Sequence, residues 1–278
     1  MNARLFPAHW RPALEEVAFA SASGFAAMQF PGPAGGLGHE RLGAPVAAVA
    51  DALEAAGIEP VQEVLVFVGA DGTTADGETP LDVLRANLEP ARRLGVRRAH
   101  LHLALADWSL DDASVHRLER SLEPTLREAV AIAADAGMCL GIEHNQPALR
   151  LLADPHRLAD LLDAVPGLGL VWDLNHTPPD RLELFTPLAP RMLLLHVSDT
   201  QLPLVNGHLP LGRGSLDLAL YLGAAVRAGF TGPAVLEVGG HPASGGFGQD
   251  SDAALRDSLA RLRVLVAALG EPSPERGA

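Results

Sequence analysis

The feature that most constrains this chain is the strict alternation of short apolar runs with longer helical patterns along its 278 residues. Such alternation implies parallel strands joined by right-handed crossovers. Counting gives eight strands if a weak first one, over residues 5–10 and containing Pro7, is included. The length is close to the roughly 250 residues typical of an eight-stranded barrel. We therefore expect an α/β fold, a single (β/α)8 TIM barrel over residues 1–270, with a disordered tail over 271–278.

An open doubly wound sheet is the competing architecture. It usually carries a Gly-rich phosphate fingerprint after its first strand, and none follows Phe6. The barrel is therefore the favoured arrangement.

Four consecutive apolar runs in the second half of the chain end in a group that can bind a hard cation. The groups that follow these runs are Glu143, Asp173, His196 and Glu237. In a barrel of parallel strands the carboxyl ends meet on one face, so these side chains are expected to converge there. An acid at the end of a buried strand is costly unless it is paired or bound to a metal.

Three carboxylates and one imidazole form a mainly hard ligand set. They suit one divalent ion, with Mn²⁺ favoured and Mg²⁺, Co²⁺ or Zn²⁺ compatible. Four protein ligands on an octahedral ion leave room for two substrate oxygens, as a vicinal hydroxy-ketone offers. The ion would stabilise the enediolate formed when the adjacent carbon loses a proton. Glu143 and Glu237 are the candidates for removing and returning that proton.

The composition excludes several classes of protein. All 21 basic residues are Arg, so Schiff-base chemistry, pyridoxal-phosphate attachment and a P-loop lysine are excluded. The net charge of −13 opposes binding to nucleic acid or to an anionic membrane. Pro and Gly interrupt every apolar run well short of a membrane span, and no secretory signal is recognisable at the start. We expect a cytoplasmic protein with a small neutral or weakly charged substrate, and Cys139 as a buried thiol.

Five motifs carry a family resemblance. They are Gly141-Ile142-Glu143-His144-Asn145, Asp173 with His176, Leu195-His196-Val197-Ser198-Asp199, Gly212-Arg213-Gly214-Ser215-Leu216-Asp217, and Glu237 at a strand end. On these motifs the chain resembles the xylose isomerase-like TIM barrel superfamily of sugar isomerases and epimerases. The motifs span the carboxyl-terminal half, whereas the amino-terminal half matches only in its alternating pattern.

The resemblance implies a metal-dependent isomerase or epimerase that acts on a small ketose or related polyol. In ketose 3-epimerase-like members, the residues matching the four strand-end groups hold a divalent metal, and the two Glu transfer protons. The residue matching His176 contacts substrate. An Arg that epimerases often use near Asp199 is absent, and Arg213 is expected to replace it.

Further residues are expected to line the substrate pocket because they lie at or beyond strand ends. They are His102, His208, Trp108 and His9. A homo-oligomer is compatible with the resemblance, and nothing in the sequence selects one.

Three alternatives remain open. The same metal and base would serve a lyase that dehydrates a keto-inositol. The superfamily also contains zinc-dependent endonucleases of abasic DNA with a three-metal cluster, in which His208 would match a ligand but Asn206 lacks the required acid. The third alternative is a barrel that binds sugar or metal without turnover.

Overall fold

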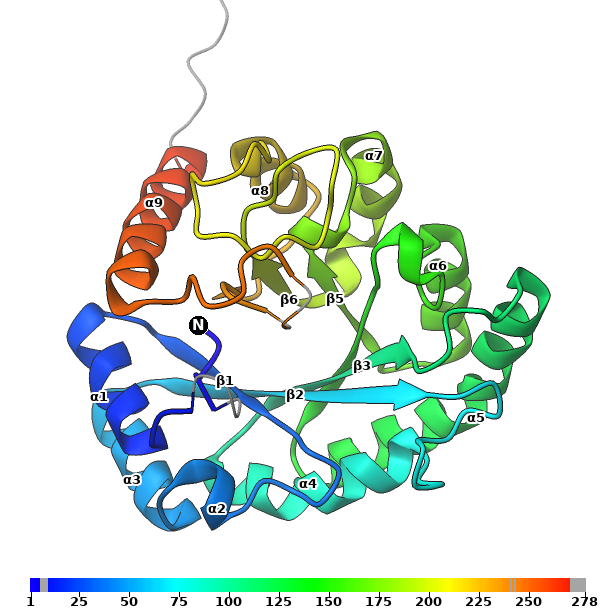
Figure 1. Cartoon of the computed structure of the whole chain (residues 1–278), viewed down its shortest axis with the longest axis horizontal. Helices are drawn as coiled ribbons and strands as arrows, with labels where there is room; N and C mark the ends of the chain where they lie inside the picture. The colour runs from blue at the N-terminus through cyan, green and yellow to red at the C-terminus, as the bar shows by residue number, and fades with distance from the viewer. Residues whose placement is uncertain (6–9, 241, 243, 271–278) are drawn as a thin grey trace, which may run out of the picture.

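The computed structural model describes residues 1–5, 10–240, 242 and 244–270. Seven parallel strands form one sheet in the order β1 to β7, and helices cover its outer face (Figure 1). The sheet closes into a nearly complete barrel, because each strand is joined to the next by a crossover that packs on the same face. The strands are β1 (Ala27–Pro31), β2 (Glu59–Val68), β3 (Arg98–Leu105), β4 (Cys139–Glu143), β5 (Gly169–Asp173), β6 (Met192–Val197) and β7 (Ala234–Leu236).

The helices begin and end at local signals in the sequence. Thr79 and Asp82 form a capping box at the start of α4, and Gly95 ends that helix in the left-handed conformation. Asp111 caps α5 through the backbone N–H of Ser114. The helices are α1 (Ala13–Ser23), α2 (His39–Leu42), α3 (Val46–Ala56), α4 (Pro80–Leu94), α5 (Asp112–Asp135), α6 (Pro155–Ala164), α7 (Leu182–Phe185), α8 (Leu218–Arg227) and α9 (Asp252–Gly270). None of the helices in the described part of the chain is long and apolar enough to cross a membrane.

The N-terminal segment closes the gap between β7 and β1. Asn2 forms an isolated parallel bridge with Gln29 of β1, and its backbone N–H donates to the Leu236 carbonyl of β7 at 3.0 Å. The predicted first strand over residues 5–10 falls mostly outside the described residues, and the pairing that the structure describes for this segment lies at Asn2. Residues 6–9, including the predicted pocket residue His9, lie outside the described residues.

Two expectations need correction. The helix expected from Asp180 onward is reduced to the four residues of α7 between two 3₁₀ turns, because Pro187 and Pro190 lack the N–H that a longer helix requires. Cys139 is exposed, not buried. It is the first residue of β4, at the end of the barrel opposite the strand-end acids.

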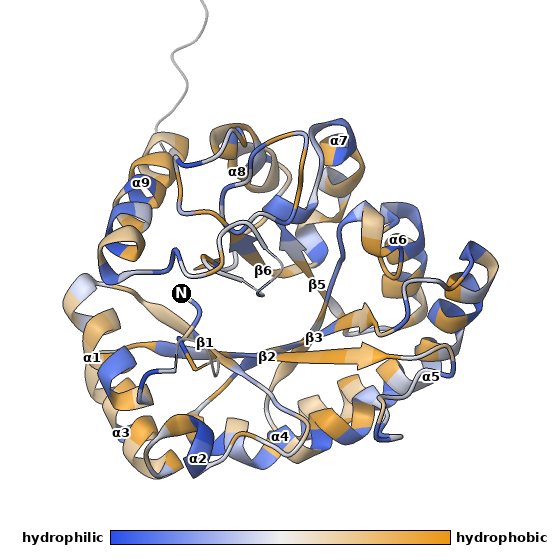
Figure 2. Cartoon of the chain, in the orientation of Figure 1, coloured by the Kyte–Doolittle hydropathy of each residue, from blue (hydrophilic) through white to orange (hydrophobic). Residues whose placement is uncertain are grey.

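Hydrophobic residues make up much of the strands (Figure 2), and buried apolar side chains form one large core cluster. A small cluster fills the barrel interior and consists of Val61, Val171, Leu194 and Val235. Each precedes a polar residue of the same chain segment by two positions; these polar residues are Glu63, Asp173, His196 and Glu237. Because side chains alternate along a strand, the polar residues point to the same interior, one layer closer to the carboxyl ends. The site thus lies directly above an apolar layer of the barrel interior.

Candidate metal and substrate site

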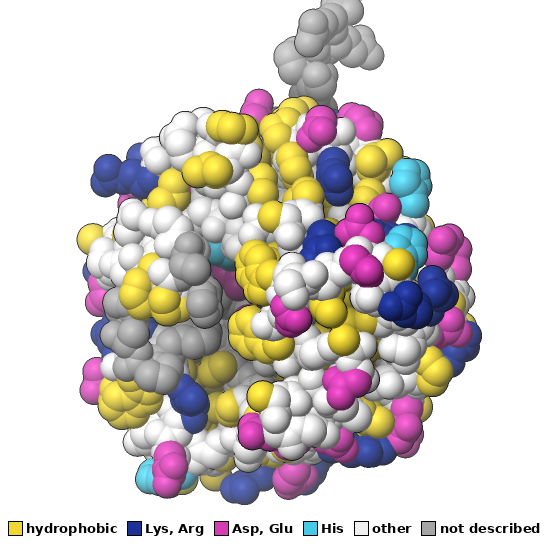
Figure 3. Space-filling view, turned by 45° about the vertical axis from the view of Figure 1, so that its right-hand side comes forward, with side chains coloured by type: hydrophobic (Ala, Val, Ile, Leu, Met, Phe, Trp, Pro, Cys, Tyr) yellow, Lys and Arg dark blue, Asp and Glu magenta, His cyan; other side chains and the backbone are white. Residues whose placement is uncertain are grey.

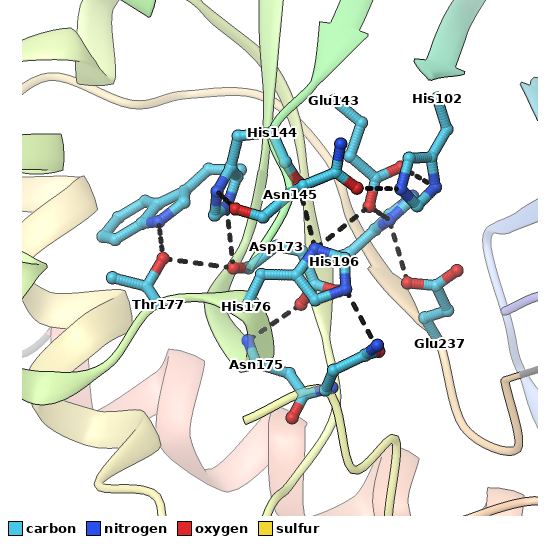
Figure 4. Close-up of polar contacts among 12 residues, drawn as sticks. His102, Glu143, His144, Asn145, Asp173, Asn175, His176, Thr177, His196 and Glu237 are labelled. Atoms are coloured by element: carbon cyan, nitrogen blue, oxygen red, sulfur yellow. Dashed lines mark hydrogen bonds and ion pairs between the residues drawn. The ribbon is translucent and has the colours of Figure 1, made fainter. Parts of the chain in front are cut away.

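The four residues predicted from the strand ends are brought together at the carboxyl end of the barrel. Glu143 and Asp173 are the last residues of β4 and β5, His196 lies in β6, and Glu237 follows β7. All four are buried, and one ligand atom from each lies within 4.8 Å of the others. Figure 4 shows these side chains directed toward one another.

The hydrogen bonding of the three carboxylates tests whether a cation fits. Glu143 Oε2, Asp173 Oδ2 and Glu237 Oε2 have no hydrogen-bond partner among the described residues, although imidazoles lie near each of them. Burying a charged oxygen without a partner is costly. Three such oxygens beside one imidazole nitrogen form a set of ligands that a hard divalent ion would bind.

Gln29 of β1 orients the imidazole of His196. The Gln29 amide nitrogen donates to Asn2 Oδ1 at 2.7 Å and to Glu63 Oε2 at 3.0 Å. Its amide oxygen therefore faces His196 Nε2, at 2.9 Å, and accepts a hydrogen bond from the N–H at that position. His196 Nδ1 lies 3.1 Å from Glu143 Oε1 and 3.0 Å from Glu237 Oε2, so Nδ1 is the atom available to a metal.

His102 of β3 is held between two carboxylates. Its Nδ1 lies 3.1 Å from Glu63 Oε1 and 3.3 Å from Glu143 Oε2, and its Nε2 lies 3.0 Å from Asn145 Oδ1. The Asn145 amide nitrogen donates to the Leu103 and Leu151 carbonyls, so its oxygen accepts from His102. Burial opposes the charged imidazole, but Glu143 and Glu63 raise the pKa of His102 to about 10.

His176 presents an unprotonated nitrogen to the site. Its Nδ1 donates to the His144 carbonyl at 3.0 Å, which leaves Nε2 as an acceptor, 3.2 Å from Asp173 Oδ2. Burial, the largest cause, lowers the pKa of His176. His144 itself contacts the Asp173 carbonyl at 3.0 Å and packs against Phe185, so it supports β5 and does not line the cavity of the described residues.

The clustered charges shift one another's pKa. Burial and the Glu237 carboxylate raise the pKa of Asp173 to about 8. Burial disfavours the charged form of Glu237, but His196 outweighs it and lowers the pKa of Glu237 to about 2. Burial also opposes charge on His196, whereas Glu143 and Glu237 raise its pKa well above the usual value. A cation that binds here must displace protons from Asp173 and His196.

A second set of histidines borders the four-residue cluster. His102, Glu143 and His176 form one further group with metal-ligand spacing, and Asp173, His176 and His208 form another. Each group shares a member with the four-residue cluster. A nuclease with a three-metal cluster would need an acid at position 206. Asn206 stands there, and its amide oxygen lies 2.5 Å from His208 Nε2.

A cavity of about 710 Å³ opens above the cluster. His102, His176, His208 and Glu237 line it, and so does Trp108, which is 61 % exposed. Of the predicted pocket residues in the described part of the chain, Arg213 alone does not line this cavity. Its side chain is exposed on the surface.

The motif around Arg213 has a structural explanation. Asp199 accepts hydrogen bonds from the backbone N–H groups of Gly212, Gly214 and Leu216, at 2.9, 3.0 and 3.1 Å. A Cβ at Gly214 would come within 2.3 Å of the Thr200 carbonyl oxygen. The motif therefore fastens a loop to the end of β6, and the Arg213 side chain takes no part in it.

Several polar residues that contact the site were not predicted from the sequence. Gln29 contacts His196, Asn2 contacts Glu237, and Glu63 and Asn145 contact His102. Gln29 and Glu63 are polar residues within apolar strands and Asn145 follows one closely, which is the signal that could have revealed them. His100, two residues before His102, lies one layer deeper, with its Nε2 3.3 Å from Glu143 Oε2.

Comparison with known proteins identifies the class to which this fold and site belong. The model of the xylose isomerase-like TIM barrel family matches residues 17–265. The chain therefore belongs to this family, as the sequence motifs predicted. No protein with a curated function matches the chain.

Several solved structures share the fold at low sequence identity. The IOLI protein with a bound zinc atom has a TM-score of 0.74 and 15 % identity, over 94 % of this chain and 95 % of that one. The D-allulose 3-epimerase from Methylomonas sp. in complex with D-allulose has a TM-score of 0.75 and 16 % identity, over 95 % of each chain. The 3-keto-D-glucoside 4-epimerase YcjR from E. coli has a TM-score of 0.69 and 16 % identity, over 95 % of this chain and 98 % of that one. At these identities the likeness shows the fold alone.

Proposed function

We propose that this protein is a divalent-metal-dependent sugar isomerase or epimerase that acts on a keto-sugar or related polyol. The observation that carries the proposal is the buried cluster of Glu143, Asp173, His196 and Glu237, in which each carboxylate has an oxygen without a hydrogen-bond partner among the described residues. The cluster lies at the base of a cavity large enough for a sugar. The fold that this chain shares with sugar epimerases is consistent with the proposal.

These four residues would hold the ion, which when bound supplies a positive charge that stabilises a developing oxyanion. The three carboxylates favour Mn²⁺, and Mg²⁺, Co²⁺ and Zn²⁺ are also compatible with this donor set. His176 Nε2, which lacks a proton, would accept a hydrogen bond from a substrate hydroxyl. The histidine thereby orients the carbon chain across the cluster.

Glu143 and Glu237 would transfer the proton. They come from β4 and β7, on opposite sides of the cluster, and can approach a bound sugar from different directions. The ionised carboxylate of one removes the proton next to the carbonyl, and the protonated carboxyl of the other returns a proton to the same carbon. The pair then exchanges protons with water before the next turnover.

The test is elemental analysis of the purified protein, followed by incubation of the metal-loaded form with a panel of keto-sugars in D₂O and NMR detection. We expect about one ion per chain and deuterium at the carbon next to the carbonyl. Glu143→Gln and Glu237→Gln are each expected to lower the rate by roughly 10²–10⁴-fold. Glu183→Gln, an exposed acid on α7, is the control. Normal exchange by either site variant would refute the proton-transfer pair.

A zinc-dependent nuclease of abasic DNA is the second candidate, favoured by the three additional histidine-containing groups with metal-ligand spacing. Asn206 in place of an acid and the net charge of −13 oppose it. About three zinc ions per chain, cleavage of abasic DNA and no deuterium exchange would support it in place of the isomerase.

A further inference from the structure

The cavity above the metal cluster has a polar floor and an apolar wall. Its floor is lined by Asn2, Glu63, His102, His176, His208 and Glu237. Higher up, the lining side chains are Leu65, Phe67, Ala104, Trp108 and Leu149. Three of them are substantially exposed: Leu65 by 37 %, Phe67 by 45 % and Trp108 by 61 %. Such exposure is unusual for apolar residues that point into a barrel.

The wall is built by two strands that extend beyond their neighbours. The pairing of β3 with β4 stops at His102 and Glu143, whereas the pairing of β2 with β3 continues to Val68 and Leu105. Each of these two strands therefore has three more paired residues, which extend the β2–β3 edge about 10 Å beyond the level of Glu143. Figure 2 shows this extended part of β2 as hydrophobic.

Alternation along β2 links the wall to the chemistry. Glu63, Leu65 and Phe67 are two residues apart and so point to the same side, with Glu63 contacting His102 at 3.1 Å. Leu65 pairs with His102 itself and Phe67 pairs with Ala104. A ligand that reaches the metal cluster would therefore also contact this wall. Figure 3 looks onto this face and shows hydrophobic side chains along one edge of a hollow.

An unsubstituted sugar can offer such a wall only the C–H groups of one face. Each hydroxyl of a free ketose loses hydrogen bonds to water when it is buried against Leu, Phe or Trp, which costs free energy. The two Arg side chains that line the cavity already have partners. Arg4 pairs with Glu16 at 2.9 Å, and Arg41 donates to the Leu5 carbonyl. A volume of about 710 Å³ also lies within the range of pockets for drug-sized ligands.

We propose that the wall formed by Leu65, Phe67 and Trp108 is a binding subsite for an apolar group carried by the substrate. The substrate class is then a keto-sugar bearing an aryl or alkyl substituent, such as an oxidised glycoside, with the sugar on the polar floor. The exposed indole ring of Trp108 favours a planar aryl group. This inference rests on the proposed sugar chemistry of the floor, but it can be tested by binding alone.

The experiment compares the binding of phenyl and methyl glycosides to the metal-loaded protein by isothermal titration calorimetry. Matched pairs of glucosides, galactosides, mannosides and allosides cover the unknown stereochemistry of the sugar. We expect at least one phenyl glycoside to bind about tenfold more tightly than its methyl partner, because the ring is removed from water. Equal affinities in every pair would overturn the subsite.

Three variants locate the effect. Leu65→Ser and Trp108→Ala are expected to reduce the phenyl-to-methyl ratio to about 2 or less. Leu184→Ser removes a leucine of similar exposure, 41 %, that lies on α7 outside the cavity, and it should keep the wild-type ratio. Thermal unfolding of each variant verifies that it is folded. An unchanged ratio in Leu65→Ser and Trp108→Ala would place the apolar group elsewhere and refute the proposal.

Two further outcomes separate this inference from the proposed function. A phenyl preference that depends on Leu65, without deuterium exchange on any keto-sugar, would support the subsite and contradict the isomerase. Deuterium exchange on unsubstituted ketoses without any phenyl preference would support the isomerase and contradict the subsite. If Leu65→Ser converts a dimer to a monomer and leaves the phenyl-to-methyl ratio unchanged, a second copy of the chain covers the wall and the subsite is refuted.

Discussion

Replacing Gln29 with methionine should weaken metal binding although Gln29 is not a ligand. Gln29 is 2 % exposed and makes hydrogen bonds to His196, Asn2 and Glu63. Methionine has a similar length and no hydrogen-bonding amide, so all three partners lose their bond to residue 29. His196 is then free to carry its proton on Nδ1, the atom that faces Glu143 and the cluster.

The magnitude follows from these contacts. Loss of a group that orients a ligating histidine typically costs 10–100-fold in metal affinity. Each buried polar group left without a partner costs about 1–3 kcal/mol of stability, and His196 is fully buried. We therefore expect Gln29→Met to raise the dissociation constant for Mn²⁺ by roughly 10–100-fold and to lower the free energy of unfolding by at least about 1 kcal/mol.

The assay is competition with a fluorescent chelator for the metal, alongside urea unfolding after dialysis against a chelator. Gln62→Met is a matched control, because Gln62 is also buried in the sheet but makes one long hydrogen bond of 3.5 Å, to Asn87 on α4. The control should leave metal affinity within about twofold. A wild-type metal affinity in folded Gln29→Met would refute the orienting role of the amide.

Three further predictions concern the same region. His176→Ala should lower kcat/KM for the substrate about 10–100-fold, through a lost hydrogen bond, while metal content by elemental analysis stays near wild type; loss of the metal would instead assign His176 to the ligands. Because the pKa of Asp173 is raised to about 8 and that of His196 is also raised, both bind protons near neutral pH. Metal affinity should therefore fall as the pH drops below about 8, with proton release detected by calorimetry in two buffers; binding without proton release would contradict these pKa shifts. Asp199→Asn should lower the melting temperature by several degrees, because the Asn amide cannot accept all the hydrogen bonds that backbone N–H groups now donate to the carboxylate. An unchanged melting temperature would show that other contacts hold the loop.

The strand ends could be predicted because their signal is local. An apolar run buried on both faces allows few polar residues, so Glu143 and Asp173 stand out at its end. Parallel strands in a barrel then place successive ends on one face whatever the loops contain. The positions of most helices followed from caps and glycines in the same way, as at Thr79 and Gly95 of α4.

Predictions that depended on a side chain's direction were less secure. Arg213 stands in one of the motifs that carried the family resemblance, but the loop is held through its backbone by Asp199, and the Arg213 side chain is exposed on the surface. Cys139 lies at the start of an apolar strand, where the barrel ends and solvent begins. Neither direction is encoded in the residues adjacent to these positions.

The sequence by itself determined the barrel class, the order of its strands and the four groups that meet at their carboxyl ends, because alternation and burial act over a few residues at a time. Only the tertiary structure decided how those groups are held. Gln29 reaches His196 across 167 positions, and Glu63 reaches His102 across 39. The apolar wall likewise depends on β2 and β3 extending beyond β4, which is a matter of register between strands. Contacts of this kind are set by the closure of the barrel, which no local pattern specifies.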